Sequence, residues 1–581
     1  MSRSVLSYLA QYVALRYFYS GIWVVNKHHQ KREFLVLFLC AFSCSKLFAA
    51  PVVPVSLPTN AGETLKQSIP NSPTHNHSMD QDILPVMPLP RGGHSHGGAQ
   101  VHVKEFRFLG VTRFPQSELQ ALIRDQLGRD LDVADLYAVA DRLTGFYRNH
   151  GYILARAYLP AQSLDAGIVT FRILEGRYGR VQLNNHSRVR AIQLQPFLSD
   201  LKEGQVVETR SLERQLLLMN DIPGVVVHST LAPGVHVGET SLSVQATSTP
   251  LVQGHFSLDN WGEQFTGAVR GSAQVDVFDP TGLGDHLDAY LMDTQYGGTK
   301  YGHFAYDVGV GGQGLRLGSS YDSLHYLLAQ TYNALHAFGT AQTGSAYMLW
   351  PWVRSRQQTV DVTLSYAHRT LHDLVMSVGS QDAKWSQIGS VLINGQALIR
   401  DMDQATWSVQ VTHGVERSEG VSAASDQVAG LYTHINLDGS WAHAFGNQWT
   451  FYAHAQAQRA SGNLDLSEKM SLGGPQGVRA YPMGEVQADD AVLGTLELRR
   501  RLNTSTQVWA FWDAGFGHGY HDPLPTDMNN KRAIGGPGFG GGWIISPHVS
   551  SRLDLAWPVE SPATSAPQDR PTIWWQLMSS F

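Results

Sequence analysis

The sequence predicts a membrane all-β barrel of about 16 antiparallel strands, preceded by two small α/β domains in tandem. Three observations support this fold class. The N-terminus has the order of an export signal, residues 101–249 repeat one order of strands and helices, and residues 250–581 alternate apolar and polar side chains. The composition agrees, because 56 glycines and 10 % aromatic residues suit a chain of many strands and tight turns.

Residues 1–50 are interpreted as a signal peptide. A basic stretch, KHHQKR, precedes the apolar run FLVLFLCAFSC, and LFAAP supplies small residues for cleavage near Ala49 or Ala50. The apolar run is too short to span a bilayer comfortably. The residues before the basic stretch are explained either by a start codon upstream of the true one or by a signal peptide of a long type. The two cysteines, Cys40 and Cys44, lie inside this segment, so the exported chain is expected to use no disulfide and no cysteine-ligated metal.

Residues 51–100 have the composition of a linker. Prolines recur among Ser, Thr, Asn and Gly, a mixture that buries too little apolar surface to order itself. One piece, AGETLKQSI at residues 61–69, has the pattern of two helical turns. GHSHG matches G-x-S-x-G but lacks the strand before it and the helix after it that a nucleophile elbow requires. Four histidines are more typical of a flexible linker than of a metal site: His75, His77, His94 and His96.

Residues 101–176 and 177–249 are predicted to be two copies of one α/β domain. In the first copy, VHVKEFRFLGV is expected to form a strand, two amphipathic helices follow, and YILARAYLP and GIVTFRILEG close the sheet. Asp132 suits an N-cap and Gly151 a helix end. The second copy repeats this order with GRVQLNN, VRAIQLQPFL, SLERQLLLMNDI, VVVHSTL and TSLSVQA.

Both copies resemble a known domain. The stretches GYILARAYLPAQSLDAGIVTFRILEGRYGRVQL and LERQLLLMNDIPGV look like the two polypeptide-transport-associated (POTRA) domains of the TpsB family. This family consists of outer-membrane transporters of two-partner secretion, the haemolysin secretion/activation type. The likeness covers residues 101–249 almost continuously. It implies a barrel in the bacterial outer membrane, with the POTRA domains in the periplasm.

Residues 250–581 are expected to form the barrel itself. VRGSAQVDV and WTFYAHAQAQ each have one apolar and one polar face, a pattern that also fits a soluble sandwich. Export, the abundance of aromatic residues and the chain end favour a barrel, which leaves no backbone group unpaired in lipid. The chain ends in IWWQLMSSF, and a terminal aromatic such as Phe581 resembles the outer-membrane sorting end of bacterial barrels.

The first barrel hairpin also resembles the TpsB family. LDNWGEQFTGAVRGSAQVDVFDPTGLGDHLDAYL contains a Pro-x-Gly-x-Gly-Asp turn, made here by Pro280, Gly282, Gly284 and Asp285. Gly and Pro at these positions are typical of a tight turn. We expect these four residues to form a structural turn on the periplasmic side.

A glycine-rich stretch, GGPQGVRAYPMG, carries one arginine between apolar neighbours. A turn requires no arginine, so the charge is either incidental on a solvated turn or has a specific partner. In the TpsB family a late loop returns into the lumen with a Val-Arg-Gly-aromatic motif that pairs with an aspartate on the wall. The resemblance assigns Val478, Arg479 and Tyr481 to this motif, with Ala480 in place of the glycine. Ala tolerates positive φ poorly, so the tip is expected to turn slightly differently.

The matching wall motif is FWDAGFG, which contains Phe511, Asp513 and Gly515. Alternation directs Asp513 to the lumen if Trp512 faces lipid. A guanidinium inside a barrel is costly to desolvate unless a carboxylate meets it with two parallel hydrogen bonds. We therefore expect Arg479 and Asp513 to form a pair that ties the returning loop to the wall.

The resemblance implies protein export. The POTRA domains would capture a large, unfolded exoprotein with an N-terminal secretion domain, of the haemolysin or adhesin type, and the barrel would pass it to the cell surface. No P-loop occurs in the sequence, so folding of the exoprotein outside is the expected source of free energy. Outer-membrane lipids and the barrel assembly machinery are further expected partners. Residues 61–69 stand where relatives have a helix that plugs the pore and are therefore a candidate plug helix. The resemblance implies that this helix and the Arg479 loop gate the pore.

Other functions account for parts of the sequence. An outer-membrane assembly factor shares the POTRA domains and the arginine loop, although such relatives usually carry more POTRA domains. A passive diffusion porin requires neither feature. No paired carboxylates, metal cluster or convincing nucleophile motif predicts an enzyme, and no cofactor or metal is expected. The 43 Lys and Arg against 49 Asp and Glu show no nucleic-acid footprint.

Overall fold

A computed structural model describes residues 59–69, 100–164, 166–400, 403–419, 428–523, 530–560, 562–565 and 571–581. The expected signal peptide lies outside these residues, as do the four linker histidines and the GHSHG motif. No helix in the described part of the chain is long and apolar enough to cross a membrane.

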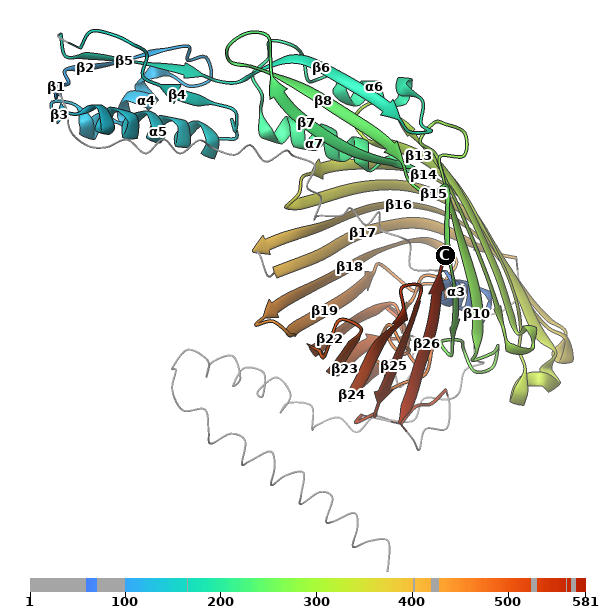
Figure 1. Cartoon of the computed structure of the whole chain (residues 1–581). Coiled ribbons are helices and arrows are strands. Elements are labelled where there is room, and N and C mark those ends of the chain that lie inside the picture. Colours follow the sequence, from blue (N-terminus) through green and yellow to red (C-terminus); the bar gives the residue numbers. More distant parts are fainter. Residues whose placement is uncertain are drawn as a thin grey trace, which may run out of the picture. The chain divides into compact units, whose positions relative to one another are not determined.

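The first α/β module has a three-stranded sheet in the order β2-β5-β4, with β2 and β5 parallel and β4 antiparallel to β5 (Figure 1). Its elements are β1 Val101–His102, β2 Glu105–Leu109, α4 Gln116–Leu122, the 3-10 turn η3 Arg124–Gln126, β3 Asp130–Leu131, α5 Val133–Asn149, β4 Arg156–Tyr158 and β5 Ile168–Leu174. The N-cap expected at Asp132 is confirmed, because its side chain accepts from Asp135 N at 2.8 Å in a capping box. Apolar side chains of α5 and the sheet form the module core.

Two strands of this module are shorter than the sequence pattern suggests. The stretch from Val101 changes partner after His102, since β1 pairs with β3 and β2 pairs with β5. Tyr152 starts a turn in which Ala155 N donates to its carbonyl at 3.0 Å, so β4 begins at Arg156. Apolar alternation continues through both places, and hydrogen-bond partners therefore decide the boundaries.

The second module repeats the same topology. Its elements are β6 Arg177–His186, α6 Ala191–Leu198, α7 Thr209–Asn220, β7 Val225–Pro233 and β8 Glu239–Ser248. The sheet order is β6-β8-β7, with β6 and β8 parallel and β7 antiparallel to β8. In both three-stranded sheets the strand that comes last in the chain is therefore central, and it pairs with the strand that comes first in that sheet. The apolar stripe of α7 forms a second, separate core with the sheet.

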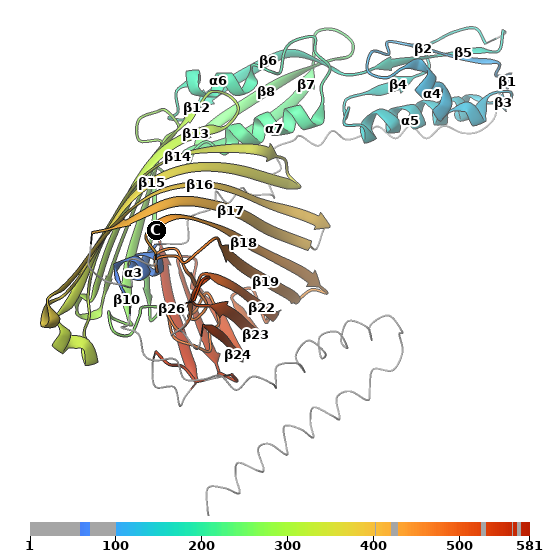
Figure 2. The ribbon, with the colours of Figure 1, turned by 180° about the vertical axis from the view of Figure 1, so that it is seen from behind.

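Sixteen of the remaining strands form a closed antiparallel barrel, as the sequence predicts (Figure 2). The wall strands are β9 Val252–Asp259, β10 Arg270–Phe278, β11 His286–Thr294, β12 Thr299–Val310, β13 Leu315–Leu327, β14 Ala337–Arg354, β15 Gln358–Val375, β16 Ser380–Arg400, β17 Asp403–Ser418, β18 Gly430–Phe445, β19 Trp449–Ala460, β22 Asp490–Arg501, β23 Thr506–His518, β24 Lys531–Ser546, β25 Val549–Ala556 and β26 Thr572–Ser580. The 3-10 turns η4 Gln295–Gly297, η5 Gln330–Leu335 and η6 Met376–Val378 lie in connections between these strands. Pairing of β26 with β9 closes the ring.

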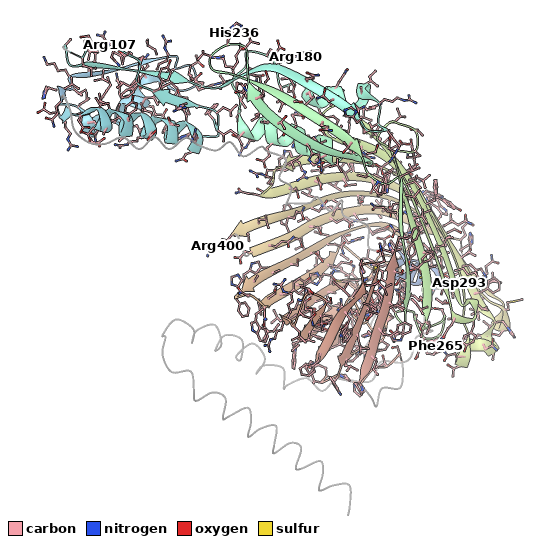
Figure 3. All side chains as sticks on the ribbon, in the orientation of Figure 1. Arg107, Arg180, His236, Phe265, Asp293 and Arg400 are labelled. Atoms are coloured by element: carbon pink, nitrogen blue, oxygen red, sulfur yellow. The ribbon has the colours of Figure 1, made fainter. Side chains whose placement is uncertain are left out.

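The two faces of the barrel wall differ, as the alternation requires. Along β11, Tyr290 and Met292 are buried, whereas Leu291 between them is 66 % exposed. Side chains project from both faces of the sheet (Figure 3). The outward row is apolar at Leu291 and again at Phe304 on β12. An apolar outer face around a polar interior is the arrangement of a membrane barrel.

Phe581 lies at the seam that closes this ring. Its backbone exchanges hydrogen bonds with Gly254 on β9, at 3.0 and 3.2 Å. Its ring stacks on Phe256 with centroids 5.4 Å apart. Both rings are exposed on the outer face. The terminal aromatic therefore extends the β9–β26 pairing to the last residue of the chain.

Candidate functional site

The barrel encloses two elements that are not part of its wall. The first is the helix α3, Ala61–Ser68, which occupies the segment in which the sequence suggested two helical turns (Figure 1). Asn60 caps it by accepting from Glu63 N at 2.9 Å. Ala61 and Leu65 are buried among inward-facing side chains of the wall: Tyr290, Met292, Tyr301, Leu324, Tyr326 and Leu371.

The polar face of α3 is buried at Glu63 and exposed at Lys66. Glu63 Oε1 accepts from Gln67 at 2.9 Å and from Gln487 at 2.8 Å. Burial, together with the nearby carboxylate of Glu263, raises the pKa of Glu63 to about 7. Docking of α3 therefore desolvates the carboxyl group of Glu63, which makes docking sensitive to pH.

The second enclosed element is the inward hairpin, which we define as residues 461–489 between β19 and β22. Its stem is the short ladder of β20 Met470–Ser471 with β21 Gln487–Ala488. Its tip holds Val478, Ala480 and Tyr481, all without solvent exposure. These side chains pack on the wall in one apolar cluster with Leu493, Phe511 and Ile534. The tip is thus a buried structure and not a solvated turn.

Arg479 and Asp513 meet at this tip. Arg479 Nε lies 2.8 Å from Asp513 Oδ2, and Nη2 lies 2.8 Å from Oδ1. Both residues are buried, and Asp513 is 0 % exposed. The guanidinium carbon lies 3.3 Å from the ring centroid of Phe511, so the wall motif supplies a carboxylate and an aromatic face to one cation.

Two further carboxylates of the site were not among the residues expected from the sequence. Glu497 Oε1 on β22 lies 2.7 Å from Arg479 Nη1, and Asp554 Oδ1 on β25 lies 3.5 Å from the same nitrogen. Both lie at inward-facing positions of strands in which side chains alternate between the two faces. That alternation is the sequence signal from which they could have been predicted. Arg499 pairs with Glu497 at 2.7 Å and Arg552 with Asp554 at 2.6 Å. Three arginines therefore balance three carboxylates.

Small residues let the tip approach the wall closely. A Cβ built on Gly515 would lie 3.3 Å from Val478 Cγ2, and one built on Gly536 would lie 2.9 Å from Ala480 Cβ. Ala480 does not adopt a positive φ, so alanine fits this tip without the strain that its place in the motif suggested. Its carbonyl accepts from Thr572 Oγ1 at 2.9 Å.

The expected turn residues lie away from this site, where the barrel meets the second module. Gly282 and Gly284 have φ of +81° and +68°, which requires glycine, and Asp285 is buried and accepts from Thr281 Oγ1 at 3.0 Å. Pro280 completes the turn between β10 and β11. The turn also contacts the module, because Arg190 N donates to the Gly282 carbonyl at 2.9 Å.

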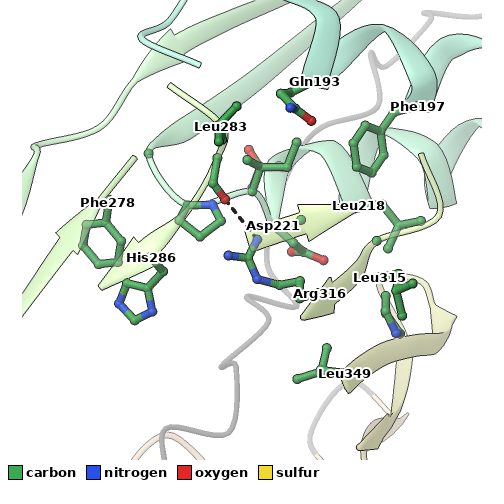
Figure 4. A pocket seen from close by; sticks show the side chains of 18 of the residues that line it. Gln193, Phe197, Leu218, Asp221, Phe278, Leu283, His286, Leu315, Arg316 and Leu349 are labelled. Atoms are coloured by element: carbon green, nitrogen blue, oxygen red, sulfur yellow. Dashed lines mark hydrogen bonds between the residues drawn. The ribbon is translucent and has the colours of Figure 1, made fainter. Parts of the chain in front are cut away.

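A pocket of about 320 Å³ lies at the same junction (Figure 4). Phe197 and Leu218 of the second module line it together with Leu315 and Leu349 of the barrel, and Arg316 donates to the Gly284 carbonyl beside it at 3.2 Å. The described residues contain no group of three or more His, Cys, Asp or Glu side chains that could hold a metal ion.

Comparisons with known proteins agree with this geometry. Residues 101–176 match the family described as POTRA domain, ShlB-type, and residues 238–532 match the family described as haemolysin secretion/activation protein ShlB/FhaC/HecB. The heme/hemopexin transporter protein HuxB of Haemophilus influenzae is 26 % identical over 480 residues, covering 80 % of this chain and 84 % of the relative. The outer membrane transporter CdiB of Escherichia coli is 22 % identical over 528 residues, covering 86 % and 85 %.

Solved structures show the same fold. CdiB from Escherichia coli has a TM-score of 0.69 at 20 % identity, covering 86 % of this chain and 94 % of that one. BamA from Haemophilus ducreyi lacking POTRA domains 1–3 has a TM-score of 0.50 at 13 % identity, covering 83 % and 100 %.

Proposed function

Because the chain belongs to the ShlB/FhaC/HecB family of haemolysin secretion/activation proteins, we propose that its lumen is a gated export pore, closed at rest by α3 and by the inward hairpin. The family supplies the broader function, which is two-partner secretion of an exoprotein through an outer-membrane barrel with periplasmic POTRA domains. The observation that carries the proposal is the pair of buried, non-covalent obstructions inside an otherwise polar barrel. Because α3 and the inward hairpin are held by ion pairs and apolar packing, they can move out of the lumen without breaking the backbone hydrogen bonds of the wall.

The partner is a large exoprotein that arrives unfolded in the periplasm. The HuxB relative is described as a heme/hemopexin transporter. For this chain we propose a partner of the haemolysin or adhesin type with an N-terminal secretion domain. We also propose that the barrel assembly machinery inserts the protein, with the exposed Phe581 at the β9–β26 seam as the feature that it reads.

We assign capture of the exoprotein to the two α/β modules. Because the second module has the topology of the first, we propose that it is also a POTRA domain. Each sheet has its second strand at one edge, β4 in the first module and β7 in the second. An unfolded segment can add to such an edge through backbone hydrogen bonds without a fixed sequence. The groove between the helices and the sheet is an alternative binding site for the unfolded segment. Binding is expected to be weak, because a disordered ligand must also be ordered.

The test uses the full chain reconstituted in liposomes. A fragment containing the secretion domain of the exoprotein should become protected from protease inside the vesicles, and removal of residues 101–249 should abolish that protection. An assembly factor would instead promote insertion of other barrel proteins. A porin would pass small solutes at rest. Either of these outcomes, without protected exoprotein, would contradict the export function for this chain.

A further inference from the structure

The inward hairpin carries a second set of buried charges, at its base. Asp465 and Glu468 precede β20, and both are buried. Asp465 Oδ2 lies 2.9 Å from Lys384 Nζ on β16. Glu468 lies 2.6 Å from Arg369 Nη1 on β15 and 3.0 Å from His434 Nε2 on β18. Two of the places at which the hairpin is attached to the wall are the tip anchor (Arg479) and the base anchor (Asp465 and Glu468). A further ion pair joins Glu485 of the hairpin to Arg532 on β24.

The two anchors have opposite polarity and hold different strands. At the tip, the hairpin supplies the cation and β22, β23 and β25 supply the carboxylates. At the base, the hairpin supplies the carboxylates and β15, β16 and β18 supply the basic side chains. The two anchors therefore join hairpin and wall with the charges in opposite senses.

The base anchor, and not the tip anchor, adjoins α3. Lys66 Nζ donates to the backbone carbonyl of Lys469. A Cβ built on Gly62 would lie 2.8 Å from Ser467 Cβ and 2.9 Å from an oxygen of Asp465, so the helix rests directly on this segment. The opposite side of α3 packs on the wall. The helix is thus held between the wall and the hairpin base.

We propose that Asp465 and Glu468 are positioning residues that hold the hairpin base against the wall and thereby clamp α3 in the lumen, whereas Arg479 positions the tip. This inference rests on the proposed function, because it assigns separate roles to the two anchors of the same gate. Loss of the base anchor releases α3 while the tip stays docked. Loss of the tip anchor leaves α3 in place.

The wall around the base anchor permits reversible release. Asp382 lies 3.2 Å from Lys384, and Glu416 on β17 is buried at the register position opposite Ser386. In the described part of the chain Glu416 Oε1 has no hydrogen-bond partner. When Asp465 leaves, these two wall carboxylates remain to neutralise Lys384. A buried cation left with no partner would make release far more costly.

The test measures α3 docking directly, in the full chain with Cys40 and Cys44 replaced by serine. Cysteines introduced by Gly62→Cys and Ser467→Cys need only a small shift to reach the Cβ separation of about 3.8 Å that a disulfide requires. In the parent chain this pair should oxidise readily and hold single-channel openings in planar bilayers closed until a reductant is added. Adding Glu468→Gln should slow the oxidation about tenfold, and without the cysteines it should raise the open fraction several-fold.

Three comparisons make the result specific. Arg459→Gln removes a cation next to the same hairpin. The partner of Arg459 is Asp490, which does not contact α3, so this change should alter neither the oxidation rate nor the open fraction. Arg369→Glu combined with Glu468→Arg restores the pair in reverse and should restore both readouts. Arg479→Ala should leave the oxidation rate unchanged.

Unchanged oxidation and conductance in Glu468→Gln would overturn the inference, as would equal effects of Arg479→Ala and Glu468→Gln on α3. If Glu468→Gln fails to insert, as judged by loss of heat-modifiable migration, Asp465→Asn takes its place in the same assays. Neither readout requires the exoprotein, so failure of the export proposal would be seen separately, in the liposome assay.

Discussion

Arg479 of the inward hairpin and Asp513 of β23 are joined by three hydrogen bonds. Two come from the guanidinium, at 2.8 Å each, and the third comes from the backbone N–H of Arg479 to Asp513 Oδ2 at 3.1 Å. Thr495 Oγ1 donates to the same carboxylate at 2.9 Å. Because side chain and backbone of one residue meet one carboxylate, the contact fixes the orientation of the tip as well as its position.

Arg479→Ala should impair secretion strongly while leaving barrel insertion nearly intact. The wall is held by its backbone ladder, whereas breaking a buried pair costs about 3–5 kcal/mol at the tip. Arg479→Lys should rescue only in part, because an ammonium lacks the planar fork. Secretion of the exoprotein and heat-modifiable migration measure the two properties. Arg142→Ala, which removes an exposed pair with Asp125, is the control and should secrete normally.

A double-mutant cycle of Arg479 and Asp513 should show strong coupling, of about 0.5–3 kcal/mol on hairpin docking. Docking can be followed by protease accessibility of the hairpin from outside. Additive losses from the two single changes would mean that the residues act independently in spite of their contact.

Gly515→Val should displace the hairpin tip without removing any charge. Even the first carbon of a side chain at this position would lie 3.3 Å from Val478 Cγ2, and valine adds two more. Secretion should fall to a level close to that of Arg479→Ala. Val478→Ala in the same chain should recover part of it by making room. If Gly515→Val secretes normally, close packing of the tip is not required for export.

If α3 is the plug, the open probability of the pore should increase as the pH is raised from about 5 to 7. Glu63 has a pKa raised from 4.5 to about 7 when α3 is docked, so docking favours the protonated acid and weakens as pH rises through this window. The free energy of α3 docking should change by on the order of 1 kcal/mol per pH unit within this window.

Single-channel recordings at a series of pH values measure this dependence. Glu63→Gln should remove most of the rise, because the amide cannot ionise, although Glu263 nearby also titrates with a raised pKa and leaves a residual slope. Deletion of residues 55–72 should give larger and steadier openings with no such profile. Equal opening at pH 5 and 7 in the parent chain would contradict the role of Glu63.

Phe581→Ala should lower the amount of assembled barrel in the outer membrane, with little effect on the stability of molecules that do assemble. The ring is 57 % exposed and contacts Phe256, so its loss removes little buried surface. The assembled fraction in purified outer membranes is the measurement. Phe539→Ala, which removes another exposed outer ring, is a matched control.

Much of this architecture follows from local pattern. A two-residue alternation specifies which face of each strand meets lipid, and closure follows because no strand edge can remain unpaired in a bilayer. The repeated order of strands and helices in residues 101–249 indicates the two modules, and their shared sheet order agrees with it. Short-range signals such as the Asp132 cap were also readable, since the atoms involved lie within a few residues of each other.

Tertiary structure alone decided which charges share a site. Glu497 and Asp554 stand 18 and 75 residues from Arg479, and Arg369 and Lys384 precede the hairpin by about 100 and 80 residues. Alternation says that each of these side chains faces inward, but not at what depth or opposite which strand. Depth depends on the register of every neighbouring pair around the closed barrel, and the path of the hairpin depends on the lumen that those strands enclose. The burial of these charges, and with it the cost of separating them, therefore exists only in the assembled barrel.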